Sequence, residues 1–280
     1  MLIAANCDQS VPPHPRALWV WKADAIVNDA SRWPGFFKFL ESPKGDPKAR
    51  ISVIFLACKV KNSSNGRGLA RFLGEAHHRR LRVDYLCGDA GYATPERAKE
   101  GLDLVADVLQ HNRTAPNPSR FDGIQFDVEP YSLPGWPKQS ILEGYLSFLS
   151  QVRNRIDQSK QTLSFGAAIP RWFDGANLHG LYKSVLDRVD YVAVMDYVSK
   201  PDQFVSDALN TVKYASEKGK DVWLGAEVSE LPLEKSSTFY SLGNAKLEAT
   251  FAAAAQRFEG SRGFKGVAIE WYDTYLSLRP

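Results

Sequence analysis

The sequence holds few of the residues that bind metal ions. Five of its 280 residues are histidine and three are cysteine. Cys7, Cys58 and Cys87 show no spacing typical of a zinc site, and the adjacent His77 and His78 would point in different directions on a helix. We therefore expect no metal and no cofactor, and we interpret Cys58 and Cys87 as buried thiols near strand ends.

The chain also lacks a long apolar run, an excess of one charge and any repeat. No segment has the length and apolar character of a membrane span. The 35 Lys and Arg residues are scattered and nearly balance 32 Asp and Glu residues, which does not favour a nucleic-acid partner. Residues 1–7 lack the length and basic start of a signal peptide, so a secreted or periplasmic location is expected only if they remain from a trimmed one.

What the chain does have is a regular alternation of apolar strand-like segments and amphipathic helical segments. Strands are predicted at 16–21, 51–58, 81–88, within 121–131, and at 163–170, 191–197, 222–228 and 266–272. Helices are predicted at 31–41, 69–80, after 94–97, and at 141–156, 181–186, 202–218 and 245–258.

Eight such alternations over about 265 residues are typical of a (β/α)₈ barrel. We therefore predict a single TIM-barrel domain over residues 1–280, with residues 1–15 as an extended lead-in. A doubly wound open sheet is the alternative, but no glycine-rich phosphate-binding turn follows the first strand.

The most informative segment is 121–131, in which polar and apolar residues alternate. Gln125, Asp127 and Glu129 would line one face of a strand, about 6.6 Å apart, and Pro130 would end its pairing. Carboxylates at the end of a buried strand are costly to desolvate unless they serve a site, and their mutual repulsion raises one pKa, as a general acid requires. An exposed edge strand with the same alternation is the alternative, which an enclosing barrel disfavours.

In barrels of this kind the active site lies at the carboxyl-terminal ends of the strands. Many carboxylates with Trp and Tyr, and no metal-ligand set, are typical of glycoside chemistry, in which an acid protonates the leaving oxygen and aromatic rings hold the sugar. The expected pocket consists of residues that end or follow different strands: Trp21, Cys58, Asp89, Asp127, Glu129, Tyr131, Arg171, Trp172, Asp196, Tyr197, Glu227, Glu270 and Trp271.

Several aromatic and charged residues also have plain structural interpretations. Asp89 can cap the loop before the third predicted helix, and Arg171 can be either a counter-ion for an acid or a substrate contact. Trp33 and Trp223 are expected to pack in the core. Whether Glu270 faces the barrel interior or a helix depends on a strand register that the sequence leaves open.

Three segments carry a family resemblance. Residues 122–129 read Asp-Gly-Ile-Gln-Phe-Asp-Val-Glu, residues 195–198 read Met-Asp-Tyr-Val, and Trp271 stands at the end of the last strand. These segments resemble glycoside hydrolase family 18, the chitinases and endo-β-N-acetylglucosaminidases. That family's motifs are Asp-Gly-x-Asp-x-Asp-x-Glu and Met-x-Tyr-Asp, and its last strand ends in a Trp beneath the sugar.

The resemblance implies a role for each matched residue. Glu129 would be the general acid, Asp127 would orient the substrate's N-acetyl group as the nucleophile, and Tyr197 would hydrogen-bond that acetamide. Gln125 and Val198 depart from the motifs, because both replace an Asp. They imply a divergent branch with another substrate or a loss of catalysis.

The expected substrate is an oligosaccharide or polysaccharide that contains N-acetylhexosamine, and we expect the protein to act as a monomer. The residues expected to bind it, from position in the barrel or from the resemblance, are Gln125, Trp271, Trp172, Tyr131, Asp196, Glu227, Glu270 and Trp21.

Two alternatives stay open. In the barrel glycosidases of the large clan A, an acid Glu ends the fourth strand and a nucleophilic Glu ends the seventh, and Glu129 and Glu227 occupy those places. That clan usually has Asn before the acid, where this chain has Val128. The other alternative is a glycan-binding, chitinase-like protein without catalysis, which Gln125 and Val198 favour and Glu129 disfavours.

Overall fold

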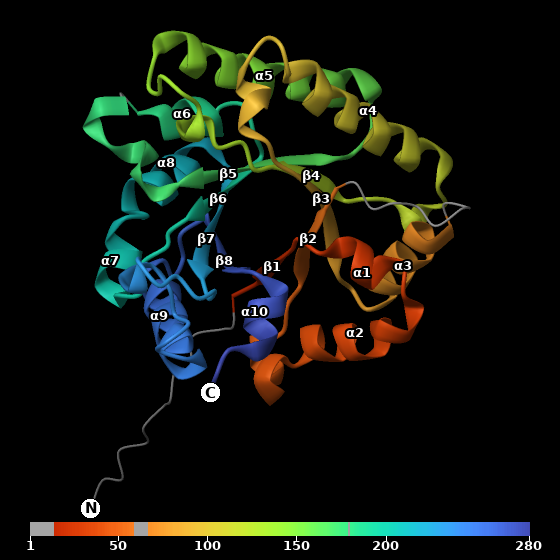
Figure 1. Ribbon diagram of the computed structural model, residues 1–280, viewed down its shortest axis with the longest axis vertical. Coiled ribbons are helices and arrows are strands. Elements are labelled where there is room, and N and C mark those ends of the chain that lie inside the picture. The colour runs from red at the N-terminus through yellow and green to blue at the C-terminus, as the bar shows by residue number, and fades with distance from the viewer. Residues whose placement is uncertain (1–13, 59–66, 179) are drawn as a thin grey trace, which may run out of the picture.

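The strands form a closed parallel barrel. The computed structural model describes residues 14–58, 67–178 and 180–280, so Cys7 and positions 1–13 of the predicted lead-in lie outside the described residues. Each strand pairs with the next and β8 returns to β1, which confirms the predicted (β/α)₈ barrel (Figure 1). The strands are β1 (Arg16–Val20), β2 (Val53–Ala57), β3 (Arg82–Cys87), β4 (Gly123–Phe126), β5 (Ser164–Pro170), β6 (Tyr191–Met195), β7 (Asp221–Glu227) and β8 (Phe264–Glu270).

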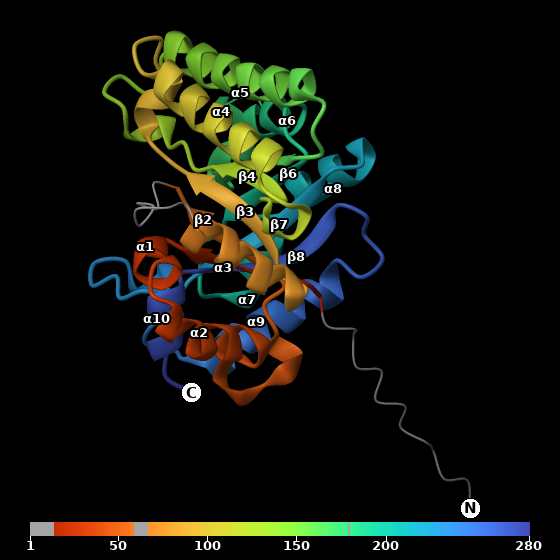
Figure 2. The ribbon, with the colours of Figure 1, turned by 90° about the vertical axis from the view of Figure 1, so that its right-hand side faces the viewer.

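Helices surround the barrel in the order in which they follow the strands (Figure 1). Figure 2 shows that β3 points toward the side of the molecule on which α1 and α10 lie, which is the carboxyl-terminal end of the barrel. The helices are α1 (Ala23–Val27), α2 (Trp33–Glu41), α3 (Arg67–His78), α4 (Ala98–Thr114), α5 (Gln139–Ser159), α6 (Leu181–Leu186), α7 (Pro201–Ser206), α8 (Leu209–Lys218), α9 (Asn244–Arg257) and α10 (Tyr272–Ser277).

The structure corrects the predicted elements in three places. The helix predicted at 202–218 is interrupted at Asp207 and Ala208, so α7 and α8 are separate. The short helices α1 and α10 were not predicted, because five or six residues are too few to show helical periodicity. The last strand ends at Glu270, and Tyr272, which was expected to belong to it, begins α10.

Apolar side chains form two cores on the two sides of the strands. On β4, Ile124 and Phe126 are fully buried against the helices, and each such side chain contributes about 1.5–3 kcal/mol relative to its exposed state. The inner core fills the barrel and includes Trp19, Phe55 and Trp223. The prediction that Trp223 is a core residue is therefore confirmed, and so is that for Trp33, which is buried and donates from Nε1 to the Ile26 carbonyl at 2.8 Å.

A buried polar chain occupies the amino-terminal half of the barrel interior. The fully buried Asp84 pairs with the Arg82 guanidinium at 2.9 Å and accepts a hydrogen bond from the Tyr191 hydroxyl at 2.7 Å. Gln125 lies 3.5 Å from that hydroxyl, and its Oε1 accepts from Trp19 Nε1 at 2.8 Å. Burial raises the pKa of Asp84, while the positive charge of Arg82 opposes the rise. Each polar group in this chain thus has a partner within the protein.

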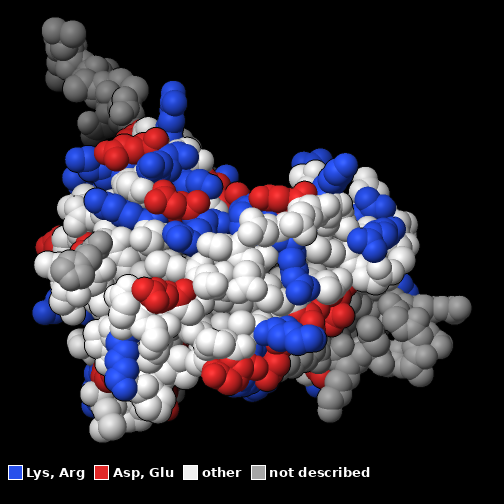
Figure 3. Space-filling view, turned by 90° about the horizontal axis from the view of Figure 1, so that it is seen from above, with Lys and Arg blue, Asp and Glu red and all other residues white. Residues whose placement is uncertain are grey.

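The outer surface carries both charge signs. On the face seen in Figure 3, which lies over α4 and α5, Lys and Arg side chains are interspersed with Asp and Glu. None of the helices in the described ranges has both the length and the apolar character needed to cross a bilayer.

Candidate active site

A small cavity of about 190 Å³ lies at the carboxyl-terminal ends of the strands. Four carboxylates from the ends of β4, β7 and β8 meet there with aromatic side chains from the ends of β1 and β6. The lining residues are Trp19, Trp21, Asp127, Glu129, Ala168, Met195, Tyr197, Glu227 and Glu270.

Asp127 and Glu129 continue the alternation of β4 beyond its last paired residue. The Asp127 amide donates to the Cys87 carbonyl at 2.8 Å, and β3 and β4 approach so closely there that a Cβ on Gly88 would lie 2.4 Å from the Asp127 carbonyl oxygen. Burial, and secondarily the negative charge of Glu129, raises the pKa of Asp127 to about 7. Its Oδ1 is buried and has no hydrogen-bond partner among the described residues. Asp127 can therefore gain or lose a proton near neutral pH. Its Oδ1 remains available to a hydrogen-bonding group in the cavity.

Glu129 is held from outside the cavity. The Tyr131 hydroxyl donates to Glu129 Oε1 at 2.7 Å, across the short 3₁₀ turn Pro130–Ser132. Burial and then this hydrogen bond raise the pKa of Tyr131, so its hydroxyl stays protonated. Glu129 Oε1 thus already accepts a hydrogen bond from Tyr131.

Glu227 and Glu270 are directly paired in the register of β7 and β8. Glu227 Oε1 accepts from the Ser229 amide at 2.6 Å, and Glu270 Oε1 accepts from Trp21 Nε1 at 2.6 Å. Burial, and then the charge of Glu227, raises the pKa of Glu270 well above its ordinary value. Glu270 therefore faces the barrel interior, which settles the orientation that the sequence left open.

Tyr197 lines the cavity beside the four carboxylates. Burial raises its pKa well above the usual value, and the surrounding carboxylates, led by Glu270, raise it further. Its neutral hydroxyl faces a cavity whose other polar groups are mostly acids. The sequence had not singled out Trp19 and Met195, although each lies two residues before a predicted site residue, Trp21 or Tyr197, on the same face of its strand.

Other predicted site residues lie outside the cavity wall. Gln125 is fully buried below it and is engaged with Trp19. Trp271 packs partly buried against the inner core, with Lys22 Nζ 4.8 Å from its ring centroid. Trp172 is 40% exposed and contacts Tyr131 at the rim, with 5.0 Å between the ring centroids.

Asp196 faces the helices rather than the cavity, because it alternates with Tyr197. It is fully buried, and neither carboxyl oxygen has a hydrogen-bond partner in the described part of the chain. Burial, and secondarily the charge of Asp207, raises its pKa to about 8. Asp196 is therefore not among the residues that line the cavity, and its predicted role in binding substrate stays a prediction.

Arg171 and Asp89 both make contacts within the protein. Arg171 Nη1 pairs with Asp207 at 2.7 Å, so it is a counter-ion. Asp89 accepts from the Gly91 amide at 2.8 Å, which caps the following turn, and it also pairs with Arg97. Cys58 is half-buried and Cys87 is buried at the ends of β2 and β3, and neither lines the cavity.

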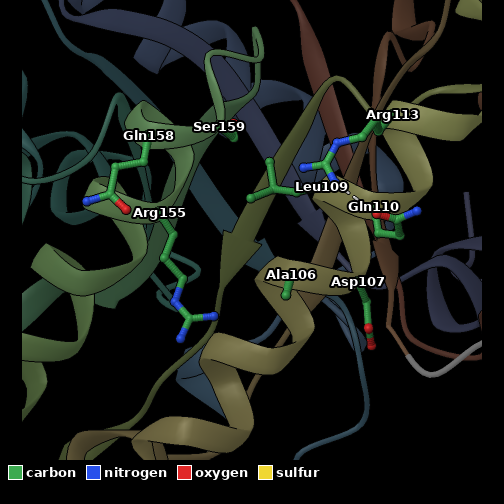
Figure 4. Close-up of a pocket in the computed structure, with 8 residues that line it drawn as sticks. All are labelled: Ala106, Asp107, Leu109, Gln110, Arg113, Arg155, Gln158 and Ser159. Carbon is green, nitrogen blue, oxygen red and sulfur yellow. Dashed lines mark hydrogen bonds between the residues drawn. The ribbon is translucent and has the colours of Figure 1, made fainter.

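Two larger hollows lie elsewhere. One, of about 720 Å³, lies on the outer surface between α4 and α5, where Asp107 and Arg113 of α4 and Arg155 and Gln158 of α5 surround it (Figure 4). The other, of about 1030 Å³, adjoins the amino-terminal end of the barrel near Arg82 and Asp122. Neither gathers carboxylates from several strand ends, so the small cavity is the candidate active site. In the described ranges, no group of three or more His, Cys, Asp or Glu is arranged to hold a metal ion.

No model of a known protein family matches the sequence, and no curated protein matches it. Solved structures do match its fold. A candidate α-L-fucosidase from Bacteroides thetaiotaomicron VPI-5482 aligns over 97% of this chain and 91% of its own, with a TM-score of 0.61 and 12% identity. A chitinase from Bacteroides thetaiotaomicron aligns over 93% and 90%, with a TM-score of 0.56 and 15% identity.

The C-terminal domain of a candidate chitinase from Desulfitobacterium hafniense DCB-2 aligns over 77% of this chain and 67% of its own, with a TM-score of 0.54 and 13% identity. At such identities the likeness concerns the fold alone. The chain is therefore a (β/α)₈ barrel whose structural neighbours include chitinases, with which it shares 13–15% sequence identity.

Proposed function

We propose that the protein is a glycoside hydrolase whose reaction takes place in the cavity at the carboxyl-terminal ends of the strands. The observation that carries this proposal is the convergence of Asp127, Glu129, Glu227 and Glu270 in one cavity. Glycoside hydrolysis uses two acidic groups in different protonation states, and an environment that raises one pKa separates them. The chitinases among the structural neighbours agree with this choice.

Glu129 is proposed as the general acid and Asp127 as the residue that orients the substrate's acetamide. Asp127 has an unsatisfied buried oxygen and a pKa of about 7, so it can donate to or accept from a polar group of the substrate. Tyr197 lies on the same wall with a neutral hydroxyl that can hydrogen-bond the acetamide. The substrate would be an oligosaccharide or polysaccharide that contains N-acetylhexosamine.

Gln125 supports this site from below. Its carboxamide replaces the family's carboxylate and is engaged with Trp19, so a relay of ionisable groups would end at Asp127. Val198 is buried and offers no polar contact where the family has an Asp. These two residues favour a substrate different from that of typical chitinases.

A second mechanism is supported by the position of Glu227. It lines the same cavity as Glu129, and the hydrogen bond from the Ser229 amide orients its carboxylate. In this mechanism Glu227 attacks the anomeric carbon, while Glu129 acts first as acid and then as base. Trapping a covalent glycosyl adduct on Glu227 would decide for this second mechanism.

The test of the proposal is the Glu129→Gln variant, assayed on a chromogenic N-acetylglucosaminide and on chitooligosaccharides. Glutamine keeps the shape but has no acidic proton, so activity should fall about 10²–10⁴-fold while the circular dichroism spectrum stays that of the wild type. The exposed Glu259→Gln is the matched control and should keep full activity. Activity of Glu129→Gln within a few-fold of wild type would remove Glu129 from this role, and binding without turnover by the wild type would favour a glycan-binding protein.

A further inference from the structure

Tyr131 joins Glu129 to a group of aromatic side chains. Tyr131 donates to Glu129 Oε1 at 2.7 Å and is not part of the cavity wall. Its ring contacts Trp172 at 5.0 Å, Phe173 at 6.3 Å and Trp136 at 6.5 Å between ring centroids, in edge-to-face geometry. We call Tyr131, Trp136, Trp172 and Phe173 the rim cluster.

The rim cluster is buried in its inner part and open at its outer part. Phe173 is 1% exposed, whereas Trp172 is 40% exposed. Edge-to-face contacts between aromatic rings are favourable, so three such contacts hold the ring of Tyr131 in place. A large exposed ring beside a pocket offers an apolar face on which a sugar can stack.

We propose that Tyr131 is a positioning residue for Glu129 and that Trp172 binds the sugar on the leaving-group side of the scissile bond. The proposal rests on the proposed function, since it assumes that Glu129 is the general acid. Tyr131 would not contact the substrate through its hydroxyl, because this hydroxyl donates to Glu129 Oε1.

The hydrogen bond determines which oxygen of Glu129 carries the proton. The Tyr131 hydroxyl stays protonated and donates to Oε1, so the transferable proton of Glu129 is on Oε2. When the glycosidic carbon–oxygen bond breaks, its electron pair stays on the leaving oxygen, which takes that proton. Glu129 becomes a carboxylate, which the Tyr131 hydroxyl stabilises, and the water that ends on the anomeric carbon returns a proton to it.

The size of the cavity places the leaving group outside it. Pockets for drug-sized ligands have volumes of about 300–1,000 Å³. The cavity, at about 190 Å³, therefore has room for little more than one sugar ring. The leaving group must lie next to the acid that protonates it, and the rim cluster adjoins Glu129 through Tyr131. A sugar in that place can stack on Trp172.

The test compares two substrates, chitotetraose and N,N′-diacetylchitobiosyl fluoride. The sugar leaving group of chitotetraose needs a proton and can stack, whereas fluoride needs little acid assistance and reaches no ring. Tyr131→Phe keeps the ring but loses the hydroxyl, so kcat on chitotetraose should fall about 10–100-fold, as expected for a hydrogen bond to a charged group. The loss on the fluoride should be less than about threefold.

Trp172→Ala should raise KM for chitotetraose about tenfold, the equivalent of roughly 1.4 kcal/mol of stacking, and should change KM for the fluoride less. Leu233→Ala removes a side chain that is 98% exposed and is the matched control, with no change on either substrate. Equal losses on both substrates in Tyr131→Phe would mean a merely structural role and would overturn the proposal. Unchanged KM in Trp172→Ala would do the same for the leaving-group site.

The failure of this inference differs from that of the proposed function. If the wild type cleaves chitotetraose but neither variant shows the substrate-dependent loss, the inference fails and the proposed function stands. If the wild type cleaves neither substrate while calorimetry shows that it binds chitotetraose, both the acid role of Glu129 and the positioning role of Tyr131 are refuted.

Discussion

The acids at the two ends of the barrel interior differ in whether their oxygens have hydrogen-bond partners. Near the amino-terminal end, Asp84 is fully buried and bonded to both Arg82 and Tyr191. At the carboxyl-terminal end, Asp127 is partly buried, its buried Oδ1 has no hydrogen-bond partner among the described residues, and it faces a cavity lined by further acids. Removing a hydrogen-bonded buried acid leaves its partners unsatisfied and so lowers stability, whereas an acid whose buried oxygen has no partner and faces a cavity is available to a ligand.

Asp196 shows that an unsatisfied acid is not by itself a site. Its carboxyl group is buried without a partner in the described ranges, yet it faces the helices rather than the cavity. The comparison therefore depends on two conditions together, the missing partner and the access to a cavity.

The largest effect is expected at the cavity end. Asp127→Asn should lower activity on chitooligosaccharides about 10²–10⁴-fold, since the amide cannot take part in proton exchange with the acetamide. Glu227→Gln should be impaired less, because the acetamide mechanism does not use Glu227 as nucleophile. Steady-state rates of both variants check this order, and a reversed order would favour the mechanism in which Glu227 attacks.

At the other end, the expected effect is on stability. Asp84→Ala leaves the buried Tyr191 hydroxyl without its acceptor and the partly exposed Arg82 guanidinium without its carboxylate, although Arg82 keeps its hydrogen bond to Ser164, so the free energy of unfolding should fall by about 1–3 kcal/mol. Activity per folded molecule should stay near that of the wild type. Urea denaturation measures the free energy of unfolding. An Asp84→Ala variant that is as stable as the wild type but inactive would show that the amino-terminal acid also serves catalysis.

A smaller effect is expected for Trp271, which the resemblance implies lies beneath the sugar. Trp271→Ala should weaken chitooligosaccharide binding about tenfold by calorimetry, because a stacking face is lost. Trp271 is part of neither the cavity wall nor the rim cluster. Unchanged affinity for a bound glycan would show that Trp271 only packs against the inner core.

The smallest effect on stability is expected for an ion pair beside the amino-terminal end of the barrel. There His77 Nε2 lies 2.9 Å from Asp122 Oδ2. The hydrogen bond to Asp122 raises the pKa of His77. This contact therefore stabilises the protein fully below the unfolded pKa of about 6.5 and less as pH rises through the higher folded value. His77→Gln should cost roughly 1 kcal/mol at pH 5.5 and less at pH 9, and an equal loss at both values would exclude this linkage.

The barrel and most of the cavity acids could be predicted from the sequence. Alternation along β4 placed Asp127 and Glu129 on one face, and barrel closure brought Glu227 and Glu270 to the same end. The same alternation, applied to β6, separates Asp196 from Tyr197, so the orientation of Asp196 could also have been inferred.

The remainder depends on contacts between distant segments, which a sequence does not show. The hydrogen bond from Tyr131 to Glu129 depends on the turn after Pro130, and the engagement of Gln125 with Trp19 joins residues 106 positions apart. Short helices such as α1 and α10 carry too little periodicity to be recognised.

We infer that the carboxyl group of Asp127, with its buried and unsatisfied Oδ1, costs stability and is kept because the cavity uses it. The most direct test is the pH dependence of the unfolding free energy of Asp127→Asn relative to wild type. Because the folded pKa of Asp127 is raised to about 7, the wild type loses stability as pH rises from about 4 through 7. Asp127→Asn should show the large loss of activity given above and should be more stable than the wild type above pH 7, by roughly 2–4 kcal/mol, with a smaller difference at pH 4. If the variant were less stable than the wild type at pH 8, the carboxylate of Asp127 would stabilise the fold, and the cavity would not hold it at a cost.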